Sequence, residues 1–290
     1  MDHCATSLVS FRLFLHDRFM SRRPHAPDSL LPPLAVIPAA GRARRLGRLP
    51  CSKEILPLPA VADGVPLLTT GVEFALKSAS AAGAEEAVIV VTPHKSDIQL
   101  YLGDGRRCGV AVEYLRVASS GSCPETVAAA AKSAGDRDIL LLFPDILWTP
   151  TRLAGSLADL RGAGAAVALA LVPSTQGAKV DIVDLRPSGR IAGLSVKPGA
   201  AAAGLTWTCA RWSPEFTELL VSELPKMRKT LEAEPHIGHF VGCAINRGWV
   251  VKGCSAAAGR ALDIGTLDDY FRAWEDPDYG ISEFCGHIEP

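Results

Sequence analysis

No apolar run in this sequence approaches the ~20 residues that a helix needs to cross a bilayer. The longest run, 165–173, has the length of a buried strand. The N-terminal stretch 7–15 is apolar, but Arg12 interrupts it and no small-residue cleavage site follows, which argues against a secretory signal. We therefore expect a protein that neither spans a membrane nor has a membrane partner.

The sequence also lacks a Cys-x-x-Cys pair, although it contains eight cysteines. Their scatter argues against a zinc site, and in a chain of this size it indicates reduced thiols and a soluble, cytoplasmic protein.

Neither sign of charge is in excess, because the chain has 30 basic and 31 acidic residues and a net charge of -1. We therefore expect no nucleic-acid partner. A hydrophobic share of 48% and a mean hydropathy of +0.18 exclude wholesale disorder, and 290 residues can bury a sizeable core.

From Leu34 onward, short apolar runs alternate with amphipathic stretches. Continuous apolar runs are typical of buried parallel strands, and apolar residues at spacings of three and four predict helices. This alternation predicts an α/β fold with a doubly wound, mostly parallel, Rossmann-like sheet that is covered on both faces. We expect strands at 34–37, 87–91, 110–114, 139–143 and 165–172, and helices at 68–79, 94–102, 124–134 and 151–161.

The pattern changes after Lys179. Three β-like stretches joined by turn residues follow, at 180–184, 191–196 and 205–212, and they predict a smaller antiparallel β part in the second half. Before Leu34, a segment rich in proline and arginine has no packing period. We therefore expect a flexible N-terminal extension at 1–33, a single domain at 34–275 and a C-terminal tail at 276–290.

A loop of small residues follows the first predicted strand, at 37–47. Small residues at the end of a parallel strand let backbone N–H groups approach a phosphate closely, and arginines add charge-assisted contacts. The loop contains four arginines within seven residues, Arg42, Arg44, Arg45 and Arg48. It lacks the third glycine of the dinucleotide fingerprint and the Gly-Lys-Ser/Thr of a Walker A loop. It predicts a phosphate-binding loop of another kind, with a basic surface turn as the alternative.

The stretch 37–58, which includes Lys53-Glu54 and Leu56-Pro57, resembles the opening signature of the sugar-phosphate nucleotidyltransferases (NDP-sugar pyrophosphorylases), particularly their UDP-glucose pyrophosphorylase-like branch. Three later stretches follow in the family's order. They are an apolar strand ending at Asp145, a segment ending in Lys197-Pro198, and Asp263 with the Ile264-Gly265-Thr266 that follows it. The resemblance covers about 34–275 and implies a GT-A-like nucleotidyltransferase fold.

The resemblance implies an Mg²⁺-dependent enzyme that joins a nucleoside triphosphate and a sugar 1-phosphate, or another phosphorylated small molecule, and releases pyrophosphate. It implies that Asp145 and Asp263 bind the metal and that Arg45, Lys53 and Asp145 are catalytic. A homo-oligomeric state is left open. The resemblance also implies three substrate-binding segments. The loop after the first strand supplies Ala39, Ala40, Gly41 and Arg42. The segment 121–127, which loosely matches the family's base-reading loop, supplies Glu125, and Lys197 binds the acceptor phosphate.

The sequence departs from the family pattern at several positions. Ala43 and Arg44 replace Gly-Thr, Ser52 replaces the proline before the signature lysine, and Ser195 or Val196 stands where a glutamate usually precedes Lys-Pro. Two other functions therefore stay open. One is a cytidylyltransferase acting on a non-sugar phosphate or phosphonate, and the other is a non-catalytic regulatory homologue that binds a nucleotide-sugar.

Elementary chemistry also bears on the two aspartates. Nucleotidyl transfer brings two anions together, so the site must neutralise negative charge and align the reactants. Asp145 ends an apolar strand, where its charge needs a partner or a metal. Each of Asp145 and Asp263 could instead cap a helix. The pair His236 and His239, spaced three apart after Pro235, could suggest a metal pair, but we expect it in a surface loop.

Overall fold

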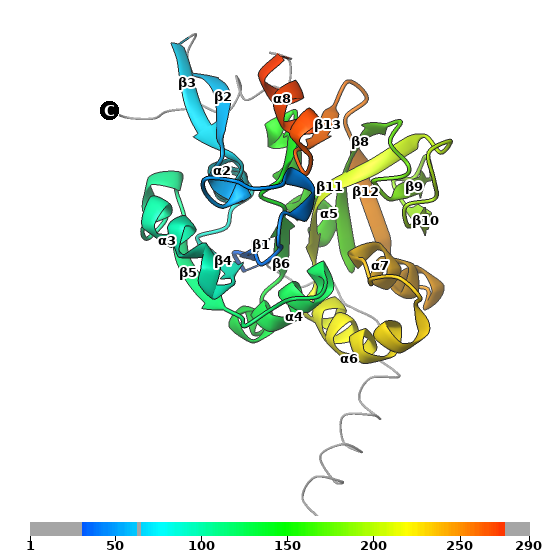
Figure 1. Ribbon diagram of the computed structural model, residues 1–290. Helices are drawn as coiled ribbons and strands as arrows, with labels where there is room; N and C mark the ends of the chain where they lie inside the picture. The colour runs from blue at the N-terminus through cyan, green and yellow to red at the C-terminus, as the bar shows by residue number, and fades with distance from the viewer. Residues whose placement is uncertain (1–30, 63–64, 276–290) are drawn as a thin grey trace, which may run out of the picture.

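A mixed sheet of nine strands forms the centre of the molecule (Figure 1). The computed structural model of the chain describes residues 31–62 and 65–275, so most of the expected N-terminal extension and the whole expected tail lie outside the described residues. The strand order is β10-β9-β11-β6-β1-β4-β5, and β8 pairs with both β11 and β12. Its strands are β1 (Leu34–Pro38), β4 (Glu86–Val91), β5 (Ala111–Arg116), β6 (Ile139–Leu142), β8 (Val167–Ser174), β9 (Ile182–Leu185), β10 (Ile191–Ser195), β11 (Gly204–Trp212) and β12 (Val251–Ser255).

The first half of the sheet is parallel, as the alternation of apolar runs and helices predicts. Strand β1 pairs in parallel with β4 and β6, and β4 pairs in parallel with β5. The long strand β11 runs antiparallel to β6, β8 and β9, and β9 pairs antiparallel with β10. The predicted fold class is therefore confirmed, including the antiparallel part in the second half.

Helices cover both faces of the sheet and enclose two apolar cores (Figure 1). Successive residues of β1 point into different cores. Ala35 and Ile37 pack in one core, and Leu34 and Val36 pack in the other. Both sets are buried because a central parallel strand has no face in solvent. One core is covered by α2 (Gly71–Ala81), α3 (Ser96–Leu102), α5 (Leu157–Gly162) and α8 (Leu267–Glu275), and the other by α4 (Cys123–Ala134), α6 (Pro214–Thr230) and α7 (Ile237–Asn246).

Two small antiparallel sheets lie beside the main one. Strands β2 (Pro57–Ala62) and β3 (Val65–Thr70) form a hairpin, and β7 (Ile146–Thr149) pairs with β13 (Arg260–Asp263). Short 3-10 turns complete the chain: η1 (Arg44–Leu46), η2 (Lys53–Ile55), η3 (Pro93–Lys95), η4 (Arg106–Cys108) and η5 (Thr151–Ala154).

Three predicted helices begin or divide differently from the expectation, and one of them, expected at 94–102, is divided into η3 and α3. The helix expected from Leu68 begins at Gly71, because Leu68 pairs with Pro59 in the β2–β3 hairpin and the hydroxyl of Thr70 accepts the N–H of Glu73 as a helix cap. The helix expected at 151–161 is divided into η5 and α5. Within the described residues, no helix has the length and apolar character needed to cross a membrane.

Candidate functional site

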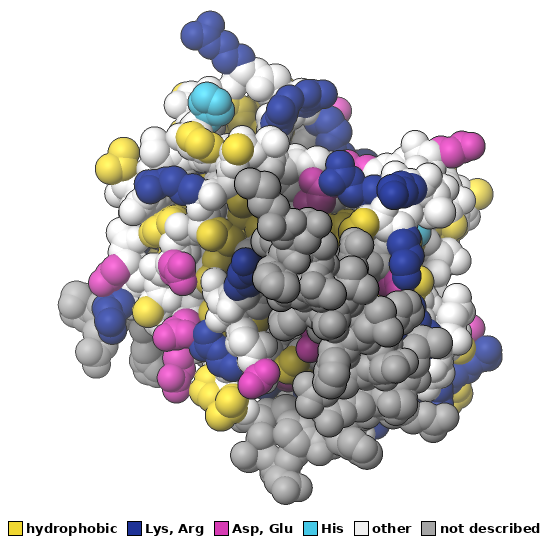
Figure 2. All heavy atoms as spheres, turned by 90° about the horizontal axis from the view of Figure 1, so that it is seen from below, with side chains coloured by type: hydrophobic (Ala, Val, Ile, Leu, Met, Phe, Trp, Pro, Cys, Tyr) yellow, Lys and Arg dark blue, Asp and Glu magenta, His cyan; other side chains and the backbone are white. Residues whose placement is uncertain are grey.

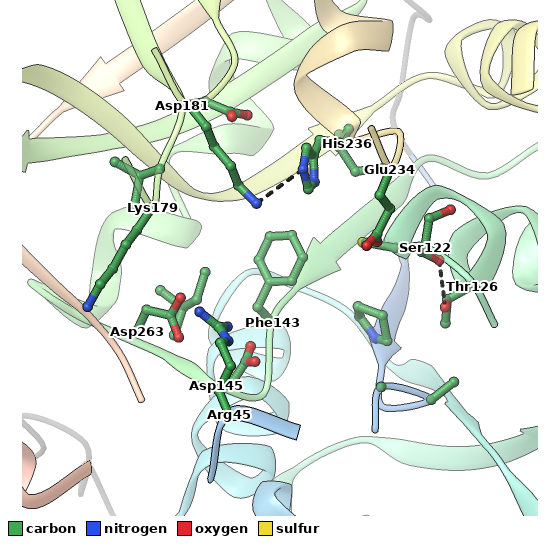
Figure 3. A pocket seen from close by; sticks show the side chains of 18 of the residues that line it. Arg45, Ser122, Thr126, Phe143, Asp145, Lys179, Asp181, Glu234, His236 and Asp263 are labelled. Carbon is green, nitrogen blue, oxygen red and sulfur yellow. Dashed lines mark hydrogen bonds between the residues drawn. The ribbon is translucent and has the colours of Figure 1, made fainter. Parts of the chain in front are cut away.

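A cavity of about 760 Å³ opens at the carboxyl ends of β1 and β6 (Figure 3). Parallel α/β sheets place their ligand sites at this edge, because strand ends and the loops after them converge there. Residues from both halves of the chain line the cavity, among them Gly41, Lys53, Asp145, Lys197 and Asp263.

The small-residue loop after β1 forms one wall of the cavity. Ala40, Gly41 and Arg42 line it, whereas Ala39 is fully buried and its backbone N–H donates to Val90 O at 2.9 Å. The position of Ala39 therefore anchors the loop on β4 rather than exposing a side chain to a ligand. An added Cβ at Gly41 would meet no atom within 4 Å, so the loop is open on the side of the cavity.

The two predicted metal ligands are brought together by the small β7–β13 sheet. Asp263 pairs with Ile146 across this sheet, and Ile264 N donates to Asp145 O at 2.9 Å. The Cα atoms of Asp145 and Asp263 are thus less than about 10 Å apart, given about 5.5 Å across a strand pair and 3.8 Å along the chain. Figure 3 shows both carboxylates in the cavity next to Arg45.

The surroundings of the two carboxylates differ. Burial raises the pKa of Asp145, but the ammonium of Lys53, which forms an ion pair with it, outweighs burial and lowers the pKa below its ordinary value. Burial and the charge of Asp145 raise the pKa of Asp263, and Arg45 opposes them in part. Burial lowers the pKa of Lys53, but Asp145 and Glu54 together raise it above its ordinary value, so Lys53 is a firmly charged cation.

A buried ion pair lies directly behind Lys53. Glu54 is fully buried and accepts a hydrogen bond from Lys95 Nζ at 2.6 Å. The hydroxyl and backbone N–H of Ser52 both donate to the Asp97 carboxylate at 2.7 Å. These contacts attach the segment before β2 to η3 and α3 and hold Lys53 toward the cavity.

Lys197 lies in the part of the cavity formed by the second half of the chain. Its Nζ is 3.1 Å from His236 Nε2, at the N-terminus of α7. The two residues that precede it, Ser195 and Val196, do not line the cavity. His236 lies in the loop before α7, as expected, but this loop lines the cavity; His239 lies within α7, so for His239 the expectation of a loop is wrong. Sequence spacing could not reveal the contact, because 39 residues separate the two side chains.

Glu125 does not line the cavity. Its carboxylate accepts the backbone N–H of Gly121 at 2.9 Å and pairs with Arg228 at 3.2 Å. The cavity is lined instead by neighbouring residues of the same segment, Ser119, Ser120, Gly121, Ser122, Cys123 and Thr126. Glu125 thus supports the shape of this segment without itself lining the cavity.

Other polar residues of the cavity carried no signal in sequence. Lys179 lines the cavity and pairs with Asp269 of α8 at 2.8 Å. Asp181, just before β9, is 7% exposed, and its Oδ2 accepts from Trp207 Nε1 at 3.0 Å. Asp181 falls in an ordinary β-like stretch and Lys179 in the turn before it, and the tertiary structure places both at the site.

The donor set of the site fits Mg²⁺ better than a metal held by the protein alone. Among residues 31–62 and 65–275, no group of three or more His, Cys, Asp or Glu side chains is placed to hold a metal ion. Mg²⁺ needs only one or two carboxylates when waters and substrate phosphates complete its octahedron. Asp145 and Asp263 match that requirement at the edge of the phosphate-loop cavity.

Comparisons with known proteins agree with this geometry. A protein-family model described as "Nucleotidyl transferase" matches residues 34–278. One similar solved structure is described as a glucose-1-phosphate thymidylyltransferase from Bacillus anthracis in complex with a sucrose, with 14% identity, a TM-score of 0.69, and coverage of 88% of this chain and 98% of that chain. Another is UDP-glucose pyrophosphorylase complexed with UDP-glucose, with 16% identity, a TM-score of 0.65, and coverage of 84% and 98%. No curated protein sequence matches the chain.

Proposed function

The chain belongs to the nucleotidyl transferase family, and we propose that it joins a nucleoside triphosphate to a sugar 1-phosphate, giving an NDP-sugar and pyrophosphate. The observation that carries this proposal is the distribution of charge in one cavity. Arg45, Lys53 and two carboxylates lie beside the small-residue loop, and a separate cation, Lys197, lies in the part formed by the second half. Two cationic subsites in one cavity suit two phosphorylated substrates.

In the proposed reaction, an oxygen of the acceptor phosphate attacks the α-phosphorus of the triphosphate. The new P–O bond forms as the bond between the α-phosphorus and the bridging oxygen to the β-phosphorus breaks, and pyrophosphate leaves. Arg45 and Lys53 would bind the triphosphate and stabilise charge that develops on the phosphoryl oxygens. Lys197 would hold the acceptor phosphate in line for attack. The protein supplies no covalent nucleophile in this scheme.

We further propose that Asp145 and Asp263 hold Mg²⁺ in this enzyme. When bound, Mg²⁺ supplies charge neutralisation for the triphosphate. The ion pair with Lys53 keeps Asp145 ionised, and an ionised carboxylate is what a hard cation requires. Burial beside Asp145 makes the charge of Asp263 costly, which a divalent cation would offset.

The activity is tested with a matrix of nucleoside triphosphates against phosphorylated acceptors, read by pyrophosphate release with and without Mg²⁺. We expect turnover with at least one triphosphate and one sugar 1-phosphate, and none without a divalent cation. Turnover only with CTP and a non-sugar phosphate or phosphonate would replace the acceptor class and keep the chemistry. A complete absence of turnover with every pair would contradict the proposed activity.

A further inference from the structure

The backbone of Lys197 has an unusual conformation for a residue with a side chain. Its φ is 42°, in the left-handed region, and the only other described non-glycine residue with a positive φ is Ala43 of the phosphate loop. Such conformations persist only where the surrounding structure fixes them, and they concentrate at functional sites. The neighbours of Lys197 are therefore the place to look for groups that hold it.

Asp181 lies behind the backbone of Lys197. Its carboxylate is nearly buried and is oriented by Trp207 Nε1 at 3.0 Å. Burial raises the pKa of Asp181, while the Trp207 hydrogen bond and both the charge and the backbone N–H of Lys197 favour the ionised form. A buried carboxylate thus faces the strained residue and complements its positive charge.

The first turn of α7 packs directly on this carboxylate. A Cβ added at Gly238 would overlap Asp181 Oδ2 and come within 2.8 Å of Leu194 Cδ2 on β10. Gly238 therefore allows a closer approach of the helix than any other residue would. Because of this approach, His236 at the N-cap of α7 reaches into the cavity, as Figure 3 shows.

The hydrogen bond between Lys197 and His236 can have only one direction of donation. An ammonium group has no lone pair, so Lys197 Nζ donates and His236 Nε2 accepts. The imidazole must then be neutral, with its proton on Nδ1, so this ring nitrogen does not also accept the backbone N–H of His239 in the turn that begins α7. Burial and the nearby charge of Lys197 lower the pKa of His236 to about 4, which agrees with a neutral ring at physiological pH. A neutral acceptor orients the ammonium without cancelling its charge, which stays available to an anion.

We propose that His236 and Asp181 are positioning residues for Lys197, so that the N-terminal turn of α7 determines where the acceptor phosphate binds. Ser195 and Val196 before Lys197 do not line the cavity. The polar groups beside Lys197 are instead Asp181, just before β9, and His236, at the N-cap of α7. This inference rests on the proposed function, since it takes Lys197 as the ligand of the acceptor phosphate.

The kinetic test compares His236→Ala, His236→Gln and Arg247→Ala, with the triphosphate and sugar 1-phosphate that the wild-type enzyme turns over best. We expect His236→Ala to raise the KM for the sugar 1-phosphate about tenfold, because one hydrogen bond to a charged group is lost, while the KM for the triphosphate changes less than twofold. His236→Gln restores an acceptor and should recover most of the loss. Arg247→Ala removes a contact with Glu223 at the far end of α7 and should leave both KM values unchanged.

An unchanged KM for the sugar 1-phosphate in His236→Ala, or equal rises in both KM values, would overturn the positioning role.

A second measurement does not depend on activity. Nitrogen-15 NMR of the histidine rings should show His236 with a bare Nε2 and a protonated Nδ1, and competitive acetylation should modify Lys197 at least threefold faster in His236→Ala than in wild type, with exposed Lys229 unchanged. If the wild type turns over no substrate pair, the proposed function fails. The NMR and acetylation results then decide the positioning inference separately: a protonated Nε2 or an unaltered Lys197 reactivity contradicts it.

Discussion

Two lysines of the cavity, Lys53 and Lys197, meet different neighbours. Lys53 is largely buried against the carboxylate of Asp145, whereas the exposed Lys197 is held by a neutral imidazole. The first arrangement suits a charge that acts on the reacting phosphate, and the second suits the capture of a second substrate.

We therefore expect Lys53→Ala and Lys197→Ala to fail in different kinetic constants. Lys53→Ala should lower kcat by about 10² to 10³, as the loss of one preorganised group at developing charge does. Lys197→Ala should mainly raise the KM for the acceptor, by about tenfold or more. Steady-state kinetics with each substrate varied in turn measures both. Equal effects confined to KM in the two variants would contradict these roles.

Substitutions of Asp145 and Asp263 should have different effects on the stability of the fold. Asp145→Asn removes the carboxylate charge with which Lys53 forms its ion pair, and the free energy of unfolding should fall by about 1 to 3 kcal/mol. Asp263→Asn removes a buried charge whose pKa is raised by burial and by Asp145, so its melting temperature should hold or rise. Both variants should lose turnover. Thermal unfolding without added metal is the measurement, and a large loss of stability in Asp263→Asn would show that its charge is favourable in the free protein.

The half-buried imidazole of His236 gives a pH dependence with a definite sign. Its pKa is about 4 when folded and 6.5 in the unfolded chain, so the unfolded state binds the proton more readily between these values. The contribution of a neutral His236 to stability is therefore fully present above pH 6.5 and is lost as the pH falls toward 4. Urea unfolding across this range should show a steeper loss in wild type than in His236→Gln. Parallel curves for the two proteins would mean that His236 titrates normally.

At the scale of elements, the small β7–β13 sheet positions the two carboxylates. Asp145 follows a parallel strand, but the contact with the segment of Asp263 is an antiparallel pairing outside the main sheet. The start of α2 packs against the same turn, since a Cβ at Gly71 would overlap Pro144 O, just before Asp145.

This packing predicts an effect of Gly71→Ala on both stability and turnover. The obstructing atom belongs to the backbone, so the turn before Asp145 must shift, and we expect a loss of about 1 to 3 kcal/mol together with a lower kcat. Gly242→Ala in α7 is the matched control, because its added Cβ meets nothing within 4 Å. It should be neutral or stabilise the fold by up to about 1 kcal/mol. Denaturant unfolding and kcat of the two variants provide the comparison, and a Gly71→Ala protein with wild-type values would show that the turn yields freely.

At the scale of the whole molecule, charge is spread over the surface and concentrated in the cavity. Figure 2 shows basic and acidic side chains interspersed on the face seen from below, in keeping with the net charge of -1. The cavity instead has six basic side chains and four acidic ones in its lining: Arg42, Arg44, Arg45, Lys53, Lys179 and Lys197, and Asp145, Asp181, Glu234 and Asp263. A polyanionic ligand should therefore bind there and couple its binding to the stability of the fold.

We expect Mg²⁺ and a nucleoside triphosphate together to raise the free energy of unfolding by about 2.7 kcal/mol at a hundredfold excess over Kd. Asp263→Asn should abolish the part of this gain that depends on Mg²⁺, while Arg247→Ala should leave it intact. Melting curves with the triphosphate alone, Mg²⁺ alone and both together measure how much each ligand contributes to the gain in stability. An identical gain in wild type and Asp263→Asn would remove Asp263 from the metal site.

The sequence by itself determined the alternation of strands and helices in the first half of the chain and the place of the small-residue loop after β1. The apolar runs at β1, β4 and β6 are continuous because both faces of these strands are buried, and that pattern can be read without a structure. Lys53, Asp145, Lys197 and Asp263 could be chosen because each follows a recognisable local pattern, and all four line the cavity.

Only the tertiary structure decided which polar side chains meet. Glu125 matched a local pattern and lies outside the cavity, whereas Lys179, Asp181 and His236 matched none and line it. The physical reason is that periodicity reports which face of an element is buried, while a hydrogen bond between Lys197 and His236 depends on how closely two distant elements pack. That distance is controlled by single close approaches, such as Gly238 against Asp181, which leave no periodic trace in the chain.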